Sequence, residues 1–213
     1  VHKPLANRLK EARLVIETAR RTGVATYFSP WDANGSMTQV MRWIKDGAIG
    51  RLREVHNWSN RPVWPQYATI PTDTPPVPRG FDWDLWLGTA PQRDYAPKIY
   101  HPMLWRSWQD FGTGWSGDIG CHIFSAFWMA FAPGPPKSVT ARAQEAWKKD
   151  PLRSVQTWPQ SNHITWEFPG NEKTEGDFKV EWFDGLFFPP EEIRAMYPYP
   201  DATYPGEAAM FVG

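Results

Sequence analysis

The chain has 213 residues, with 23 Lys and Arg against 23 Asp and Glu, so its formal net charge is zero. This balance gives no electrostatic reason to expect nucleic acid or an anionic membrane as a partner. No apolar run reaches the length of a membrane span, and the single cysteine, Cys121, excludes an internal disulfide and a cysteine-based zinc site. The length suits one large domain or two small ones.

The first sixty residues predict helices and strands in alternation. Residues 6–22 have the spacing of an amphipathic helix that Gly23 closes, and residues 24–28 read as a short buried strand. A second helix is expected over 36–46, and the alternation over 51–60 indicates a half-exposed strand. A helix followed by a short apolar strand is typical of the end of a βαβ unit, so we expect an α/β fold.

The next stretch, residues 61–103, is rich in proline and predicts a long loop without sustained helix or strand. Its many aromatic residues indicate that the loop is ordered and packs on something. Among the 14 tryptophans of the chain, Trp64, Trp83 and Trp86 are expected in the core of this loop rather than on a ligand-binding surface. His101 precedes a proline and has no visible partner in the sequence.

A glycine-punctuated segment then leads from Asp110 into one long helix that ends near Phe131, before a proline-rich stop. Asp118, His122 and Ser125 follow one another at helical spacing and form a polar stripe on this otherwise apolar helix. Taken alone, the stripe has two interpretations. One is a hydrogen-bonded pair in the core, and the other is a proton-handling pair that faces a cleft.

Further strands are predicted over residues 138–147, 163–168, 178–183 and 208–213. No helices separate the first three, so antiparallel neighbours are expected. His56 and His163 fall in predicted strands and are interpreted as ordinary surface or sheet residues. No set of His, Asp and Glu shows the spacing of a metal site.

Five ordered segments carry a resemblance to a known family. The opening H-K-P-L-A-N-R-L-K-E-A-R resembles the segment of the Gfo/Idh/MocA oxidoreductases that holds their Glu-Lys-Pro signature, and G-D-I-G-C-H resembles their Asp-x-x-x-His motif. The segments V-H-N-W-S-N-R-P-V-W-P-Q, G-F-D-W-D-L-W-L-G and W-R-S-W-Q-D-F-G-T-G look like the bacterial branch with its large aromatic loop. The resemblance runs from Lys3 to about Pro189.

The resemblance implies an α/β protein with two parts. Residues 1–30 would be the end of a Rossmann-type dinucleotide-binding domain, and residues 31–213 a substrate and oligomerisation domain with an open, mainly antiparallel sheet covered by helices on one face. The cofactor would be NAD or NADP, although no G-x-G-x-x-G phosphate loop occurs in this sequence. The partners implied are a small carbohydrate substrate and further copies of the chain, as a homodimer or homotetramer through the open sheet.

The resemblance also assigns roles to particular residues. Lys3 matches the family lysine near the nicotinamide and the reacting hydroxyl, and the Lys3–Pro4 bond would be cis, so both residues are expected on the cofactor side. Asp118 matches the acid that contacts substrate, and His122 matches the acid/base. His2 stands where the family usually has glutamate, which removes a carboxylate beside the lysine.

Four more residues are predicted to contact substrate. Ser125 stands where many members have a second aspartate, which weakens recognition of a substrate hydroxyl. Arg106, Trp108 and Asp110 could line a sugar pocket, with the indole as a ring face. The alternative is an internal Arg106–Asp110 ion pair that supports the loop.

These residues together predict an NAD(P)-dependent oxidoreductase that acts on a sugar, polyol or glycoside hydroxyl. Two rival functions stay open: an NAD-dependent glycosidase or lyase that works by transient oxidation, and a non-catalytic sugar-binding or assembly module. Hydride transfer requires the side chains of Lys3 and His122 to lie within about 10 Å of each other. The sequence leaves the sugar, the choice between NAD and NADP, and the compartment open, with export as one alternative.

Overall fold

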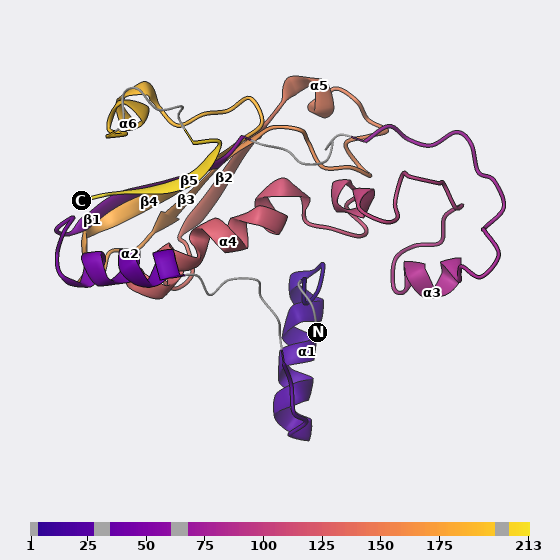
Figure 1. Cartoon of the computed structure of the whole chain (residues 1–213), viewed down its shortest axis with the longest axis horizontal. Coiled ribbons are helices and arrows are strands. Elements are labelled where there is room, and N and C mark those ends of the chain that lie inside the picture. Colours follow the sequence, from indigo (N-terminus) through magenta and orange to yellow (C-terminus); the bar gives the residue numbers. More distant parts are fainter. Residues whose placement is uncertain (1–3, 28–34, 61–67, 199–204) are drawn as a thin grey trace.

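The computed structural model describes residues 4–27, 35–60, 68–198 and 205–213. Its centre is one open sheet with the strand order β2-β3-β4-β1-β5 (Figure 1). The strands are β1 Leu52–Ser59, β2 Ser138–Ala143, β3 Asn162–Phe168, β4 Thr174–Asp184 and β5 Glu207–Val212. Only the β1–β4 pair is parallel, and the other three neighbouring pairs are antiparallel. The predicted α/β fold with an open, mainly antiparallel sheet is confirmed.

Two helices, α2 and α4, lie side by side along one face of this sheet, with the short α6 on its other side (Figure 1). The helices are α1 Leu9–Thr22, α2 Gly35–Lys45, α3 Trp83–Leu87, a 3-10 turn η1 Leu104–Ser107, α4 Gly114–Phe131, α5 Glu145–Lys148 and α6 Glu191–Ala195. Gly23 ends α1 in the left-handed conformation, and its N–H bonds to the Ala19 carbonyl, as the sequence predicts.

The core lies between α4 and the sheet. Phe127 and Phe131 are one turn apart on α4, and both pack with Val55 of β1 and Val180 of β4, which are adjacent in the sheet. At the N-terminal end of α4, Trp115 packs near Trp182 in a second cluster. The long helix predicted from its apolar stripe is therefore the main cover of the sheet.

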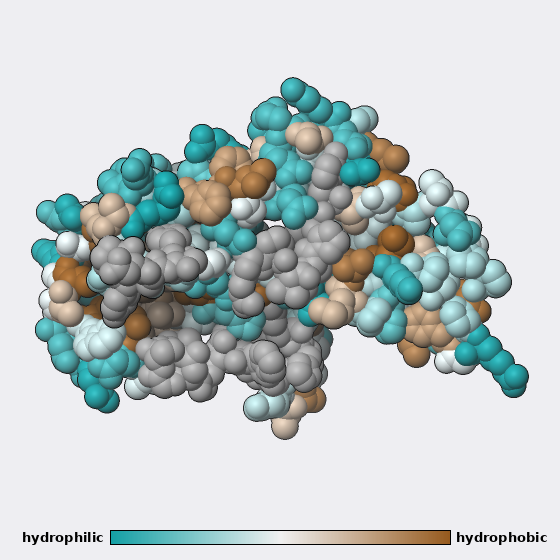
Figure 2. Space-filling view, turned by 45° about the horizontal axis from the view of Figure 1, so that its top comes forward, coloured by the Kyte–Doolittle hydropathy of each residue, from teal (hydrophilic) through white to brown (hydrophobic). Residues whose placement is uncertain are grey.

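The proline-rich loop has a core of its own, made of aromatic rings. Trp83 and Trp86 stack at 4.8 Å between ring centroids, and Tyr100 lies 4.8 Å from Trp108. This packing confirms that Trp83 and Trp86 belong to the loop core, whereas Trp64 lies outside the described residues. On the side of the molecule where this loop lies, hydrophobic residues are exposed among the hydrophilic ones (Figure 2).

Two local predictions are wrong. Residues 24–27 form no strand, and Val24 and Tyr27 are 58% and 78% exposed, because no neighbouring strand among the described residues pairs with them. The half-exposed pattern expected over 51–60 is also absent, since β1 is an inner strand between β4 and β5 and its last five residues are buried. Sequence alternation reports the chemistry of the two faces, but it does not report the depth of the strand in the sheet.

Helix α1 lies away from the sheet (Figure 1) and has no buried residue. Its apolar side chains are open to solvent, with Leu9 73% and Leu14 62% exposed. An amphipathic helix gains most of its stability by burying its apolar face, so this face has the character of a docking surface. No helix in the described part of the chain is long and apolar enough to cross a membrane.

Candidate functional site

The first turns of α4 place the candidate acid. The helix starts at Gly114, which has a φ of 70°, and the ring of Trp158 lies so close that a Cβ there would sit 2.9 Å from it. This tight entry fixes the direction of the first turn, because an L side chain is strained at such a φ. Asp118 follows one turn later and is only 9% exposed, so its carboxylate is held at the inner side of the helix.

The partner of Asp118 is Arg106, which comes from η1. Arg106 Nε donates to Asp118 Oδ2 at 3.1 Å, and its guanidinium lies 4.3 Å from the ring of Trp105. A largely buried carboxylate needs such a charged donor, and stacking on an aromatic ring further restricts the guanidinium. The structure thus joins Arg106 and Asp118 in one fixed pair and adds Trp105, which the sequence interpretation missed.

His122 and Ser125 continue the stripe along α4, and both are half-buried. Residues four apart on a helix have Cβ atoms about 6 Å apart, so the imidazole starts from the same face as the Asp118 carboxylate. The Ser125 hydroxyl donates to the Cys121 carbonyl at 2.7 Å, which is an ordinary helix-internal bond. The hydroxyl is therefore committed to the backbone in this structure.

Asp110 is paired elsewhere. It forms an ion pair with Arg93 and lies 3.9 Å from Arg8, which precedes α1. The alternative of an internal Arg106–Asp110 pair is wrong, because Arg106 is bonded to Asp118 instead. Asp110 rather joins the aromatic loop to the start of α1.

Trp108 is fully buried, with 0% exposure, and its Nε1–H donates to the Ile99 carbonyl at 3.1 Å. The prediction that its ring provides a face for a sugar is corrected by this burial, because the ring packs in the loop core and presents no face to solvent. The error arises because tryptophans in cores and in sugar-binding sites have the same sequence signal.

A cavity of about 680 Å³ lies between α1 and the aromatic loop. Leu5 and Asn7 line one side, and Trp105, Asp110 and Phe111 line the other. The Asn7 amide donates to the Gln109 carbonyl, while its Oδ1 is buried without a hydrogen-bond partner among the described residues. The cavity thus reaches from the segment after Pro4 to the ring that supports Arg106.

Lys3 lies outside the described residues, as does the Lys3–Pro4 bond, so the predicted distance between Lys3 and His122 is not tested. Pro4 itself is exposed. Within the described ranges, no group of three or more His, Cys, Asp and Glu side chains is arranged to hold a metal ion.

The other face of the sheet holds an ionic cluster that the sequence interpretation missed. His56 on β1 is 1% exposed, and its ring nitrogens lie 3.2 Å from carboxylate oxygens of Glu54 and Glu181. His163 reaches the same Glu181 at 2.8 Å. The interpretation of these histidines as ordinary sheet residues is right about the strands, but they are linked through one carboxylate. Only the register of β1 and β3 against β4 could reveal this link.

Burial alone would raise the pKa of Glu181, but the hydrogen bonds and charges of His56 and His163 outweigh it and lower the pKa to about 2. The opposite case is Asp184 at the end of β4. Burial raises its pKa to about 6, although Trp182 Nε1 and the Asn162 amide both donate to its carboxylate.

The fold and the candidate site together describe one class of α/β domain. An open sheet, one long covering helix and an acid–imidazole stripe near the start of that helix make up an α/β domain with one candidate site. The sequence model described as "Oxidoreductase family, C-terminal alpha/beta domain" matches residues 39–159. The chain therefore belongs to the Gfo/Idh/MocA oxidoreductase family and contains its C-terminal α/β domain.

Solved structures show the same fold at low sequence identity. A WlbA dehydrogenase from Bordetella pertussis, in complex with NADH and UDP-GlcNAcA, is 13% identical with a TM-score of 0.55, and covers 100% of this chain and 48% of its own. An aldose-aldose oxidoreductase from Caulobacter crescentus, complexed with glycerol, is 16% identical with a TM-score of 0.50. The match covers 86% of this chain and 42% of that oxidoreductase. A super-repressor mutant of Gal80p from Saccharomyces cerevisiae is 15% identical with a TM-score of 0.50. The match covers 89% of this chain and 42% of Gal80p.

This chain thus spans less than half the length of each of these three structures. No curated protein sequence matches it significantly.

Proposed function

We propose that the chain is the substrate side of an NAD(P)-dependent oxidoreductase that acts on a sugar, polyol or glycoside hydroxyl. The observation that carries the proposal is the Arg106–Asp118 pair at the start of α4, with His122 one turn further along the same face. In a chain of this oxidoreductase family, an oriented carboxylate next to an imidazole has the composition needed to bind an alcohol and to remove its proton.

In this proposal each residue has a separate task. Asp118, oriented by Arg106, accepts a hydrogen bond from a substrate hydroxyl. His122 takes the proton of the reacting hydroxyl, because an imidazole titrates near neutral pH. Lys3 supplies a positive charge close to the developing alkoxide. A nicotinamide group, when bound, would supply the acceptor for the hydride of the substrate carbon.

The described residues fit a nicotinamide group in one respect. The cavity between α1 and the aromatic loop has apolar walls and an unsatisfied buried acceptor, Asn7 Oδ1, a few residues after Lys3. Helix α1 also exposes Leu9 and Leu14, as expected for a helix that packs against the rest of a dinucleotide-binding domain. These observations support a boundary near residue 30 between a cofactor part and a substrate part.

Self-association through the sheet is part of the same proposal. Strand β2 lies at one edge of the sheet, and its first five residues are exposed. An uncovered strand of this kind is a surface on which a second copy can pack. Sedimentation velocity of the natural protein is expected to show a homodimer or homotetramer, and a monomer at micromolar concentration would contradict this part.

The test of the function uses the natural protein and a panel of aldoses, polyols and alkyl glycosides with NAD⁺ or NADP⁺. Formation of reduced nicotinamide, followed by absorbance, is expected with at least one compound. Asp118→Asn should then raise KM because the substrate hydroxyl meets a neutral amide in place of a charged acceptor, whereas the Kd for NADH should stay unchanged. Cleavage of a glycoside without net formation of reduced nicotinamide would favour the lyase alternative instead.

A second candidate function is a non-catalytic sugar-binding or regulatory protein. The observation that favours it is the similarity in fold to Gal80p, a structure named as a repressor rather than an oxidoreductase. Binding of NADH without turnover of any compound in the panel would support this candidate. Measurable hydride transfer would exclude it.

A further inference from the structure

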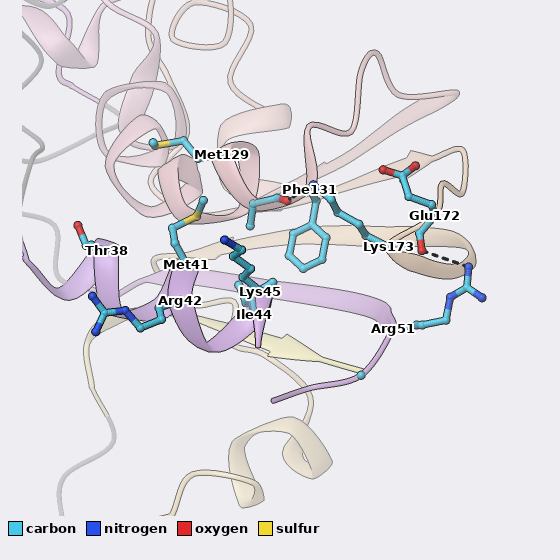
Figure 3. Close-up of a pocket in the computed structure, with 12 residues that line it drawn as sticks. Thr38, Met41, Arg42, Ile44, Lys45, Arg51, Met129, Phe131, Glu172 and Lys173 are labelled. Carbon is cyan, nitrogen blue, oxygen red and sulfur yellow. Dashed lines mark hydrogen bonds between the residues drawn. The ribbon is translucent and has the colours of Figure 1, made fainter. Parts of the chain in front are cut away.

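A second cavity, of about 640 Å³, lies at the opposite end of α4 from the candidate site (Figure 3). Ala130 lines this cavity and lies twelve residues after Asp118, so the two sites are about 18 Å apart along the helix. Helix α2, the C-terminal turn of α4 and the turn between β3 and β4 form its walls. Nothing in the proposed reaction uses this cavity.

The walls combine apolar surface with an excess of positive charge. Met41 and Ile44 of α2 face Met129 and Phe131 of α4 across the cavity (Figure 3). The charged residues that line it are four cations and one acid: Arg42, Lys45, Arg51, Lys173 and Glu172. A cavity of this size with a mostly apolar lining and a few charged groups has the properties of a small-molecule site.

The four cations have different positions. Lys173 Nζ donates to the Ala130 carbonyl at 2.8 Å and so caps the end of α4. Arg51 donates to the Glu172 carbonyl at 3.3 Å, at the far end of the cavity, and Arg42 points toward Thr38 and away from the centre (Figure 3).

The Lys45 ammonium lies over the cavity between Met41 and Phe131 (Figure 3). The side chain of Lys45, the last residue of α2, makes no hydrogen bond or ion pair with any residue in the described part of the chain. It is thus the cation best placed to receive an anion from outside.

We propose that this cavity binds an aliphatic carboxylate, with the carboxylate at Lys45 and the hydrocarbon chain between α2 and the end of α4. The charge excess selects an anion, and the methionine and phenylalanine side chains select an apolar body. Methionine suits such a site because its flexible thioether adapts to chains of different length. The volume is within the range of about 300 to 1,000 Å³ that is common for sites of drug-sized ligands.

The probe is a series of acetate, hexanoate, octanoate and decanoate, with 1-octanol as the uncharged analogue of octanoate. Calorimetric titration of the protein is expected to show affinity that rises up to about fourfold for each added methylene, because each one leaves water for an apolar wall. Acetate lacks six of the methylenes of octanoate and should show no measurable binding, whereas 1-octanol lacks the charge and should bind about fivefold more weakly than octanoate.

The location is tested by labelling the methionine methyl groups with ¹³C. Octanoate should shift the signals of Met41 and Met129, while those of Met103, Met196 and Met210, which do not line the cavity, stay in place. Each signal is assigned with a Met→Leu variant, and the shift of the signals is followed during titration.

The charge is tested with Lys45→Gln, which should weaken octanoate binding about fivefold, as expected for loss of one partly solvated ion pair. Lys10→Gln on α1 is the matched control and should leave the affinity unchanged. Thermal unfolding of both variants checks that they fold. The proposal is overturned if octanoate does not bind, if it binds without shifting Met41 and Met129, or if Lys45→Gln binds it like the wild type.

Discussion

The ionic cluster around Glu181 gives a prediction whose magnitude follows from the structure. Glu181→Gln keeps the size of the side chain but removes the charge that His56 and His163 contact at 3.2 and 2.8 Å. The Glu181 side chain is 17% exposed, so solvent screens it little. A pKa lowered from 4.5 to about 2 corresponds to about 3 kcal/mol of stability at neutral pH.

The lowered pKa of Glu181 also fixes the direction in which its contribution to stability changes with pH. Because folding lowers the pKa of Glu181, its contribution is complete above pH 4.5 and is lost as pH falls toward 2. Urea unfolding should therefore show the variant about 3 kcal/mol less stable than the wild type at neutral pH, with a difference that shrinks toward zero in acid.

Glu167→Gln is the matched control, since Glu167 lies on the neighbouring strand and its carboxylate meets only the Ser138 hydroxyl among the described residues. It should change the free energy of unfolding by less than about 1 kcal/mol. A loss below about 1 kcal/mol for Glu181→Gln, or a loss that is independent of pH, would refute the account of this cluster.

Three further predictions concern stability. Trp108→Ala should cost about 3 to 5 kcal/mol in urea unfolding because it empties the core of the aromatic loop, and a loss under about 1 kcal/mol would show that the ring is not packed as described. Gly185→Ala should cost about 1 to 3 kcal/mol, because Gly185 has a φ of 61° and a Cβ would lie 2.2 Å from Ser161 Oγ; an unchanged melting temperature would contradict this. In the wild type, the free energy of unfolding should fall as pH rises from about 4 to 6, because the raised pKa of Asp184 makes the folded chain hold a proton that the unfolded chain has released. Asp184→Asn should remove this fall. A fall of equal size in the variant would argue against the role of Asp184.

The sequence predicts the parts of this fold that depend on local pattern. The apolar stripe of α4, the left-handed end of α1 at Gly23 and the aromatic core around Trp83 and Trp86 all follow from spacing and residue type. The depth of β1 does not, because an inner strand is defined by neighbours that come more than one hundred residues later.

In the candidate site, too, some features follow from local spacing and others depend on segments that are distant in the sequence. The helical spacing of Asp118 and His122 is local, so the sequence predicts that they share a face. The choice of Asp118 rather than Asp110 as partner of Arg106 depends on how η1 approaches α4, and spacing favours neither. The link between His56 and His163 needs the register of three strands, which no single segment contains.

The most direct test of the central claim is hydride transfer by His122→Asn in the natural protein, with a substrate from the alcohol panel. If His122 removes the proton of the reacting hydroxyl, the rate of nicotinamide reduction in a single turnover should fall by a factor of about 100 to 10,000. In the proposal His122 contacts substrate and not the cofactor, so the Kd for NADH should not change. A variant that reduces the cofactor at the wild-type rate would contradict the claim.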